Sequence, residues 1–280
     1  MRNLASTKKP AEKRRNTARM ASRVLYTIIH SAVPSETGKK DAVHRDAAMW
    51  ALSEEEMTAI RLSLKVASVA TLASLPIGIL IAHTLARRQF WGRTLLDGLV
   101  HLPLVLPPVV TGYVLLLLFG RRGPIGHFLE QTFGIVFSFR WTGAALACAV
   151  MGFPLMVRAI RLAIENIDLR LERAASTLGA SPFWVFLTVT VPLALPGIVA
   201  GATLAFAKAL GEFGATITFV SNIPGETQTI PSAIYSYTQT PGGEPNALRM
   251  SLIAAVIAIV ALVVSEWLAR RTIRRGAGLE

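Results

Sequence analysis

The sequence of 280 residues has few charged residues and a single cysteine. Asp, Glu, Lys and Arg make up 16% of it, whereas a soluble globular domain carries about 25%. This deficit, together with 52% hydrophobic residues, excludes an ordinary soluble domain and indicates an integral membrane protein. The single cysteine, Cys148, lies inside an apolar run. An intramolecular disulfide and a cysteine-based metal site are therefore both excluded.

Motifs for catalysis are also missing from the sequence. It contains no phosphate-cradling Gly-Lys-Ser/Thr loop, so we expect that this chain does not itself hydrolyse ATP. It also contains no Ser–His–Asp array and no cluster of metal ligands. We therefore predict no catalytic residue, no metal and no cofactor in this chain, which argues against a membrane-embedded enzyme.

Basic residues are in excess, and the formal net charge is +12. They gather in the first 46 residues and at the ends of the apolar runs. Basic residues at the ends of apolar runs usually set the orientation of a membrane protein. We therefore expect membrane lipid, and not nucleic acid, around this chain.

Five apolar runs are present, and each reaches the roughly 20 residues that a membrane-spanning helix needs once its flanks are added. The runs are 59–85, 98–120, 141–157, 183–207 and 250–265. The predicted fold class is an all-α integral membrane protein with about five transmembrane helices.

The loops between these runs predict the orientation. Eleven Lys and Arg residues flank the runs on the side of the 158–173 loop and the C-terminus, and six flank them on the other side. The richer side is cytoplasmic by the positive-inside rule. We therefore expect the core to begin outside and the C-terminus to lie in the cytoplasm.

The first 48 residues oppose that rule. Residues 1–46 hold 11 Lys and Arg and 4 Asp and Glu, without a long apolar run. They are either a disordered basic arm or, as we favour, the result of a start assigned too far upstream, with Met49 as the real initiator. The expected organisation is an extension at 1–48, a transmembrane domain at 49–271 and a cytoplasmic tail at 272–280.

A polar segment, Glu165–Ser181, separates the third and fourth apolar runs. Apolar residues recur there at spacings of three and four, which predicts one apolar stripe on a helix that ends at Gly179. The stripe comprises Ile164, Ile167, Leu171, Ala174, Ala175 and Leu178. Glu172 and Arg173 belong to the polar surface. Such a helix either lies on the bilayer or inserts into a groove of a soluble partner, and the periodicity alone favours neither.

The same segment resembles the coupling motif of ABC importer permeases, which reads Glu-Ala-Ala, three residues, Gly, nine residues, Ile, any residue, Leu-Pro. The matching positions are Ala174, Ala175, Gly179 and Pro192. Arg173 stands at the motif's Glu position, and Glu172 lies one residue earlier. The resemblance implies that a helix over Glu165–Gly179 docks in a cleft of a separate ABC ATPase subunit. The coupling residues it implies are Glu172, Arg173, Ala174, Ala175 and Gly179.

Longer segments resemble the molybdate permeases of that family. They lie at 101–110, 120–123, 153–161, 210–219, 221–227 and 240–244, so the similarity covers roughly residues 50–271. The resemblance implies a type I ABC importer permease fold in the bacterial cytoplasmic (inner) membrane. It also implies a homodimer that moves molybdate by alternating access. Its partners would be an ATPase subunit, which binds the ATP, and a periplasmic or extracellular oxyanion-binding protein.

Two alternatives to molybdate import stay open. Tungstate nearly equals molybdate in size and charge, and sulfate belongs to the same class of substrates. An ATPase-independent anion channel or a secondary transporter is the alternative from another class. It would leave the polar segment without a purpose.

Four residues are candidates for the translocation path. Pro107 and Pro108 interrupt the second apolar run and predict either a kinked packing helix or a bent wall of the path. Lys208 and Glu212 are four residues apart and predict an ion pair near the outer interface, with a gate or an anion guide as the sharper hypothesis. The segment 211–243 is rich in Gly, Thr, Ser and Pro, which predicts an outer loop with short helices. This loop either contacts the binding protein, as we favour, or faces an oxyanion with its backbone amides and hydroxyls without holding it tightly.

Overall fold

The computed structural model describes residues 52–276, and within α13 it leaves aside the side chains of 265, 266 and 268–276. The predicted extension at 1–48, the alternative start at Met49 and the last residues of the predicted tail lie outside the described residues. Every regular element from 52 to 276 is helical, which agrees with the predicted fold class.

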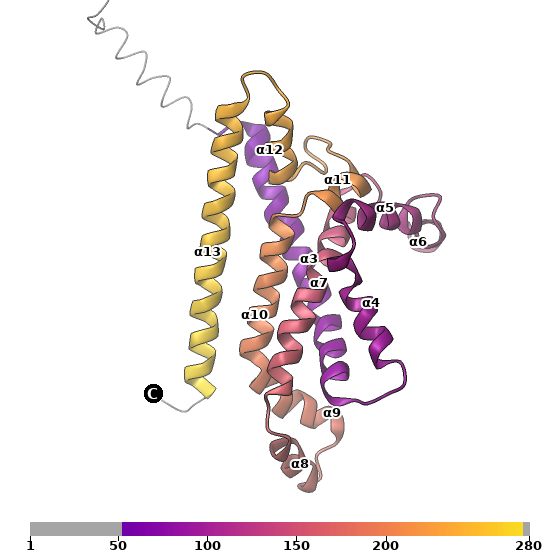
Figure 1. Cartoon of the computed structure of the whole chain (residues 1–280), viewed down its shortest axis with the longest axis vertical. Helices are drawn as coiled ribbons and strands as arrows, with labels where there is room; N and C mark the ends of the chain where they lie inside the picture. Colours follow the sequence, from indigo (N-terminus) through magenta and orange to yellow (C-terminus); the bar gives the residue numbers. More distant parts are fainter. Residues whose placement is uncertain (1–51, 277–280) are drawn as a thin grey trace, which may run out of the picture. The chain divides into compact units, whose positions relative to one another are not determined.

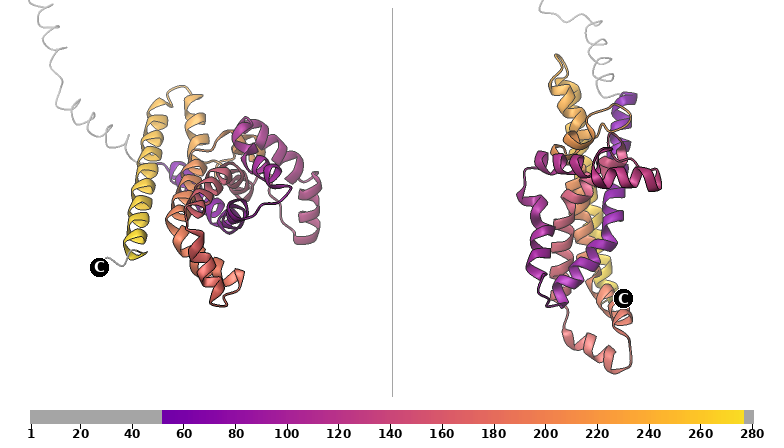
Figure 2. Two further views of the ribbon diagram at one scale, coloured as in Figure 1. Left: turned by 60° about the horizontal axis from the view of Figure 1, so that its bottom comes forward. Right: turned by 90° about the vertical axis from the view of Figure 1, so that its right-hand side faces the viewer.

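Four helices of the described part are long and apolar enough to cross a membrane. They are α3 (Glu54–Arg87), α7 (Trp141–Glu165), the segment Pro182–Leu210 and α13 (Glu244–Gly276). α7 packs against both α3 and the helix that ends the Pro182–Leu210 segment, and the two further views in Figure 2 show the same grouping. α13 continues to Gly276, so the predicted domain boundary after residue 271 falls inside a helix.

The second apolar run is not one straight span. It forms α4 (Arg93–Val105) and α5 (Pro108–Phe119), which are bent by 115° at their junction. Pro107 is the N-cap of α5 and Pro108 its first residue. Proline has no amide N–H to donate, so it tolerates a helix start but interrupts a continuing ladder. The number of spans is therefore four, or five if the bent pair crosses as one unit.

The fourth run is helical throughout but changes its winding. α9 (Pro182–Val185) leads into the π-helical segment η1 (Phe186–Thr190), which continues as α10 (Val191–Leu210). The amide of Val191 donates to the carbonyl of Phe186, five residues back. Single π-turns inside α-helices are rare and often lie at functional sites. Pro192 is the one nearby residue whose type hints at this π-turn.

Shorter helices lie at the two ends of the long ones. α6 (Pro124–Phe133), α11 (Gly214–Val220) and α12 (Ile230–Thr238) lie at one end, and α8 (Leu169–Thr177) lies at the other (Figure 1). The prediction of short helices within 211–243 is confirmed by α11 and α12. We call the end with α12 the outer end and the end with α8 the inner end, after the orientation that the loop charges predict.

Small side chains fill the core between the long helices. Ala67 of α3, Ala147 and Cys148 of α7 and Ala209 of α10 are all buried in one cluster. Small residues at helix contacts let the backbones approach closely, which is how helices associate within a membrane. Cys148 is buried as a small apolar residue, as its sequence context indicated.

Candidate functional site

The predicted coupling helix is present but begins later than the sequence suggested. α7 continues to Glu165, and α8 covers only Leu169–Thr177. The carboxylate of Asp168 accepts a hydrogen bond from the amide of Arg170 at 2.9 Å and caps α8. An N-cap residue has an extended backbone, so no continuous helix runs from Glu165 to Gly179, and that boundary was wrong.

This later start also shortens the predicted apolar stripe. Ile164 belongs to the end of α7, where it is 1% exposed within the core. Ile167 lies in the link between the two helices and packs against that core. Only the residues from Leu171 onward belong to α8 or to its end, so the stripe comprises two structures rather than one helix face.

The end of α8 has the geometry that the sequence predicted. Gly179 has φ +88°, in the left-handed region, and no heavy atom would meet a Cβ added there within 4 Å. Its amide donates to the carbonyl of Ser176 at 3.0 Å, and the amide of Ala180 donates to the carbonyl of Ala175 at 3.2 Å. This pair of bonds is a Schellman motif, which glycine favours because it has no Cβ.

The surface of α8 is open. None of its residues is buried. Leu171 within α8 is 50% exposed, and Leu178, the C-cap of α8, is 89% exposed. Isolated exposed leucines are common, but here they lie on a short polar helix beyond the ends of α7 and α9 (Figure 1). Such a surface suits a partner that covers it.

Glu172 points back to its own chain rather than to the exposed surface. Its Oε1 atom accepts hydrogen bonds from Arg87 Nε at 3.2 Å and from the Thr190 hydroxyl at 3.0 Å. Arg87 Nη2 lies 3.1 Å from the same oxygen and donates to the carbonyl of Ile167. The placement of Glu172 on the polar outer face was therefore incorrect. This carboxylate ties α8 to the end of α3 and to η1.

The other coupling candidates face outward to different degrees. Arg173 and Ala174 are exposed, and Ala175 is half-buried. Arg173 forms no ion pair with another residue in the described part of the chain. The two neighbours Glu172 and Arg173 therefore differ sharply, because one is held within the chain and the other is available to a partner.

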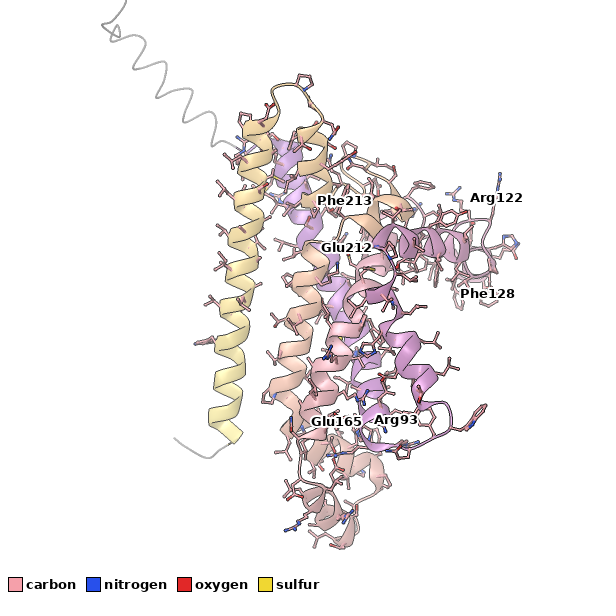
Figure 3. All side chains as sticks on the ribbon, viewed as in Figure 1. Arg93, Arg122, Phe128, Glu165, Glu212 and Phe213 are labelled. Atoms are coloured by element: carbon pink, nitrogen blue, oxygen red, sulfur yellow. The ribbon has the colours of Figure 1, made fainter. Side chains whose placement is uncertain are left out.

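A second set of charges joins α4 and α7 near the inner end. Arg161 Nη1 lies 3.1 Å from the Asp97 carboxylate, and Arg161 Nε lies 2.8 Å from Glu165. Figure 3 labels Glu165 and Arg93 toward the α8 end of the long helices, and Glu212 and Phe213 farther toward the other end. The loop arginines that we counted for orientation thus also hold the inner ends of these helices together.

The predicted ion pair between Lys208 and Glu212 is confirmed. Lys208 Nζ lies 2.7 Å from Glu212 Oε2, and the other carboxylate oxygen accepts from the amide of Ala215 at 2.9 Å. Glu212 is 2% exposed. It lies in the turn after α10 rather than within that helix. Since a buried carboxylate is stable only when paired, Lys208 and the start of α11 together account for it.

The structure brings the proline candidates close to this pair. A Cβ added to Gly214 would lie 2.7 Å from Cβ of Pro108. A Cβ added to Gly112 would lie 2.5 Å from the carbonyl oxygen of Ala215. The start of α5 therefore packs directly on α11, which the Glu212 carboxylate caps. Pro107 and Pro108 are exposed at this junction.

The sequence did not mark three residues that form long-range contacts. Arg87 and Thr190 both donate hydrogen bonds to Glu172, yet they lie 85 and 18 residues away from it in the chain. Arg249 pairs with Glu56, which lies 193 residues away. Arg87 was visible only as one of several basic loop residues, and no local pattern marks a partner at such distances.

The chain matches known proteins over most of its length. Residues 74–275 match a family described as the binding-protein-dependent transport system inner membrane component. The chain is 62% identical over 219 residues to the molybdenum transport system permease protein ModB of Escherichia coli strain K12. That alignment covers 78% of this chain and 96% of the relative. The ModB protein of Haemophilus influenzae is 58% identical over 216 residues, which are 77% of this chain and 94% of the relative.

A solved structure confirms the fold. The chain superimposes with a TM-score of 0.65 on a chain of a bacterial ABC transporter involved in the import of the acidic polysaccharide alginate. The superposition covers 93% of this chain and 98% of the other, at 17% sequence identity. At that identity the similarity supports the type I importer permease fold and carries nothing about the substrate.

Proposed function

The chain belongs to the family of binding-protein-dependent transport system inner membrane components, and from that premise we propose that it is the membrane subunit of an ATP-driven molybdate importer. The mechanism is alternating access, in which the path opens to one side of the membrane at a time. Molybdate is proposed because relatives that are 62% and 58% identical to this chain, over most of their own length, are named as molybdenum transport permeases. The chain is a multi-pass protein of the inner membrane.

The observation that carries the coupling role is α8. It is a short helix with no buried residue, it ends in a Schellman motif at Gly179, and one carboxylate ties it to the rest of the chain. Exposed leucines on such a helix suit insertion into a groove of a soluble partner. We assign that partner as an ATPase subunit that binds and hydrolyses ATP, because the sequence of this chain has no phosphate-cradling loop.

Two further partners belong to the proposal. A binding protein outside the membrane delivers the oxyanion to the outer end, where α11 and α12 form short connecting helices. A second copy of this chain completes the path, since the described helices of one copy leave many large apolar side chains exposed. Those on α4 and α5 include Leu95, Leu99, Leu102, Val105, Val109 and Tyr113.

The orientation follows from the distribution of basic residues. We place α8 in the cytoplasm, together with the C-terminus, and the start of α3 outside. Accessibility of single cysteines to a membrane-impermeant reagent tests this in intact cells. A cysteine at Thr240 of the outer loop reacts in intact cells if the orientation is right, and a cysteine at Ser176 of α8 reacts only after lysis.

The contacts in the chain offer a route for the movement of α8. Glu172 connects α8 to Arg87 of α3 and to Thr190 of η1, and η1 continues into α10. α10 ends at the Lys208–Glu212 pair, whose carboxylate caps α11 against α5. A displacement of α8 by the ATPase therefore reaches both ends of α10 through hydrogen-bonded and packed contacts. Pro107, Pro108, Lys208 and Glu212 are our candidates for the outer part of the path.

One reconstitution tests the proposal. The chain is placed in vesicles with its ATPase and its binding protein, and uptake of labelled molybdate, tungstate and sulfate is measured with and without ATP. We expect ATP-dependent uptake with molybdate as a preferred substrate. Equal uptake by the chain alone contradicts the importer and favours a channel. Strong preference for sulfate keeps the importer and rejects molybdate as its substrate.

A further inference from the structure

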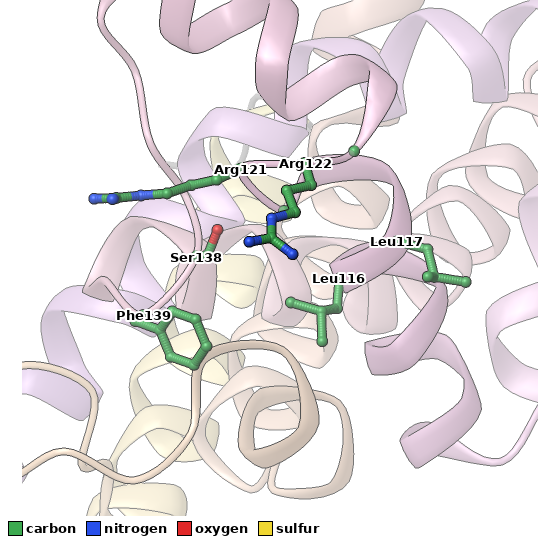
Figure 4. Close-up of a pocket in the computed structure, with 8 residues that line it drawn as sticks. Leu116, Leu117, Arg121, Arg122, Ser138 and Phe139 are labelled. Carbon is green, nitrogen blue, oxygen red and sulfur yellow. The ribbon is translucent and has the colours of Figure 1, made fainter.

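A pocket at the outer end has the composition of an anion site. It has a volume of about 360 Å³ and lies where the end of α5 meets the loop before α7. Its lining residues are Leu116, Leu117, Gly120, Arg121, Arg122, Gly123, Ser138 and Phe139. None of these eight residues is acidic. Figure 4 shows the two arginine side chains on either side of the Ser138 hydroxyl in that view.

Both arginines lack a partner within the described part of the chain. Neither Arg121 nor Arg122 forms an ion pair or a side-chain hydrogen bond there. Arg249 and Lys208 differ from these two arginines, because they are held by the carboxylates of Glu56 and Glu212. Two adjacent guanidinium groups without a counter-charge attract an anion, and their planar donor groups match the oxygens of a tetrahedral oxyanion.

Ser138 supplies the second, independent observation. Its side chain lines the pocket although the residue is only 5% exposed. Its hydroxyl oxygen is buried and makes no hydrogen bond. A buried hydroxyl without a partner costs stability. A ligand oxygen in the pocket removes this cost, because the hydroxyl then donates to it.

The backbone around the pocket adds positive potential. α6 begins at Pro124, directly after the lining residue Gly123, and α7 begins at Trp141, two residues after Phe139. Neither helix has a side-chain cap at its first turn. The amino ends of helices carry partial positive charge, which favours a nearby anion.

We propose that this pocket, formed by Arg121, Arg122 and Ser138, binds a tetrahedral oxyanion. The pocket is recessed and its hydroxyl is buried, so a small group that enters the pocket fits better than the flat surface of a docked protein. Two sources carry this chemistry: a free oxyanion in solution and the phosphate of a lipid headgroup. The inference does not depend on the proposed transport function, because it concerns anion binding by the chain alone.

The test uses the full chain in lipid nanodiscs, in one set with only zwitterionic lipid and in another with anionic phospholipid. Equilibrium dialysis with radiolabelled sulfate and with labelled molybdate measures binding of free oxyanions. Mass spectrometry of the lipid that stays with the purified chain measures headgroup binding. Three variants are compared with the native chain: R121Q/R122Q, S138A and, as a matched control, R140Q. Arg140 is an exposed arginine at the same end, next to Phe139, that does not line the pocket.

We expect one of two supporting results. If the source is free, sulfate or molybdate binds in both lipid sets, and R121Q/R122Q weakens this binding tenfold or more, since each lost charge-assisted bond accounts for about a tenfold change. If the source is lipid, anionic phospholipid is retained by the native chain and lost from R121Q/R122Q. In either case S138A weakens binding about fivefold, and R140Q leaves it unchanged.

Other results overturn the proposal. One is the absence of both oxyanion binding and selective lipid retention in the native chain. Another is an equal loss in R140Q, which would show a general effect of surface charge. A third is weaker docking of the binding protein to R121Q/R122Q without any anion binding, which would assign the arginines to that partner. S138A removes a hydroxyl oxygen that makes no hydrogen bond, so this variant is expected to fold. It therefore still tests the proposal if R121Q/R122Q does not fold.

Discussion

The outer and inner ends of the helix bundle hold their charged groups in different ways. At the outer end, Arg249 Nη2 of α13 lies 2.6 Å from Glu56 Oε1 of α3, and the Glu56 side chain is fully buried. At the inner end, Glu172 and Arg87 form the comparable pair, but Glu172 lies on a helix without a buried residue. This pair at the outer end is therefore completed by contacts within the chain. The inner end holds α8 by one carboxylate and leaves its surface for a partner.

The start of α3 shows how many contacts Glu56 makes. The amide of Ser53 donates to Glu56 Oε2 at 2.8 Å, and the amide of Glu56 donates to the Ser53 hydroxyl at 3.2 Å. This capping box begins the helix, and the same carboxylate also binds Arg249. One side chain thus serves as a helix cap and as a link between α3 and α13. On α8, Glu172 is the residue that binds two other elements in this way, since its carboxylate accepts from Arg87 of α3 and from Thr190 of η1.

The largest expected effect is the loss of the outer pair. Glu56→Ala leaves Arg249 buried without this carboxylate and removes half of the capping box. Removing one partner of a buried ion pair costs about 3–5 kcal/mol of stability. Thermal unfolding of the purified chain in nanodiscs measures the change. Glu55→Ala is the matched control, because Glu55 is its exposed neighbour. Equal shifts in both variants would mean that the burial of the pair contributes nothing.

The next largest effect is expected at the inner pair, on transport rather than on stability. Glu172→Gln weakens the bonds from the Arg87 guanidinium, which are each worth about 1.5–3 kcal/mol because both partners are charged, and the bond from the neutral Thr190 hydroxyl. We expect the amount of molybdate moved per ATP to fall about tenfold, while the chain still inserts and ATP is still hydrolysed.

Arg173→Gln is the matched control for Glu172→Gln. It changes the adjacent exposed charge, and we expect coupling to remain near that of the native chain. A variant with both Glu172→Gln and Arg87→Gln is expected to be no worse than the worse of the two single changes, because both remove the same contact. If the two single changes reduce coupling additively, or if Arg173→Gln reduces coupling more than Glu172→Gln, the Glu172–Arg87 contact does not carry the coupling.

A smaller effect is expected from strain at the end of α8. Gly179→Ala forces a Cβ into a left-handed backbone, which costs about 1–2 kcal/mol. We expect reduced ATP-dependent uptake with normal insertion. Gly134→Ala imposes the same strain at the end of α6, where φ is +66° and a Cβ also meets open space. If both substitutions lower uptake equally, the end of α8 has no special role in coupling.

The smallest effect is expected at the π-helical segment. Thr190→Val keeps the shape of a side chain that is 1% exposed and removes only its hydrogen bond to Glu172. Such a bond accounts for about 0.5–1.5 kcal/mol, so we expect a decrease in coupling of about twofold to tenfold. The control is Thr188→Val, since the Thr188 hydroxyl bonds only to the carbonyl of Trp184. Loss of coupling in the control alone would remove Thr190 from the proposed route.

The comparison also shows what the sequence was able to predict. Local patterns identified the long apolar helices, the end of α8 at Gly179 and the Lys208–Glu212 pair, because each depends on residues within a few positions of one another. The bend of 115° between α4 and α5 was only one of two interpretations of Pro107 and Pro108. Proline shows that a hydrogen bond is missing, but it does not specify the angle between the two helices.

Contacts between distant residues were outside the reach of the sequence. Glu172 was placed on a polar face because its helical position suggested it, whereas Arg87 from the end of α3 draws it inward. The start of α8 was misplaced because the apolar spacing continues through Ile164 and Ile167, although the Asp168 cap interrupts the helix. The Asp168 cap determines where α8 begins, and the ion pair with Arg87 determines where the Glu172 side chain points, in both cases against the apolar periodicity.

Cross-linking between α8 and the ATPase subunit tests the central claim most directly. The single cysteine is first replaced by Cys148→Ala, and Leu178→Cys is then compared with Leu72→Cys. Both leucines are strongly exposed, by 89% and 67%, but Leu72 lies within the long span of α3. We expect Leu178→Cys to cross-link to the ATPase, with a yield that changes when ATP binds. A cross-link from Leu72→Cys with none from Leu178→Cys would contradict it.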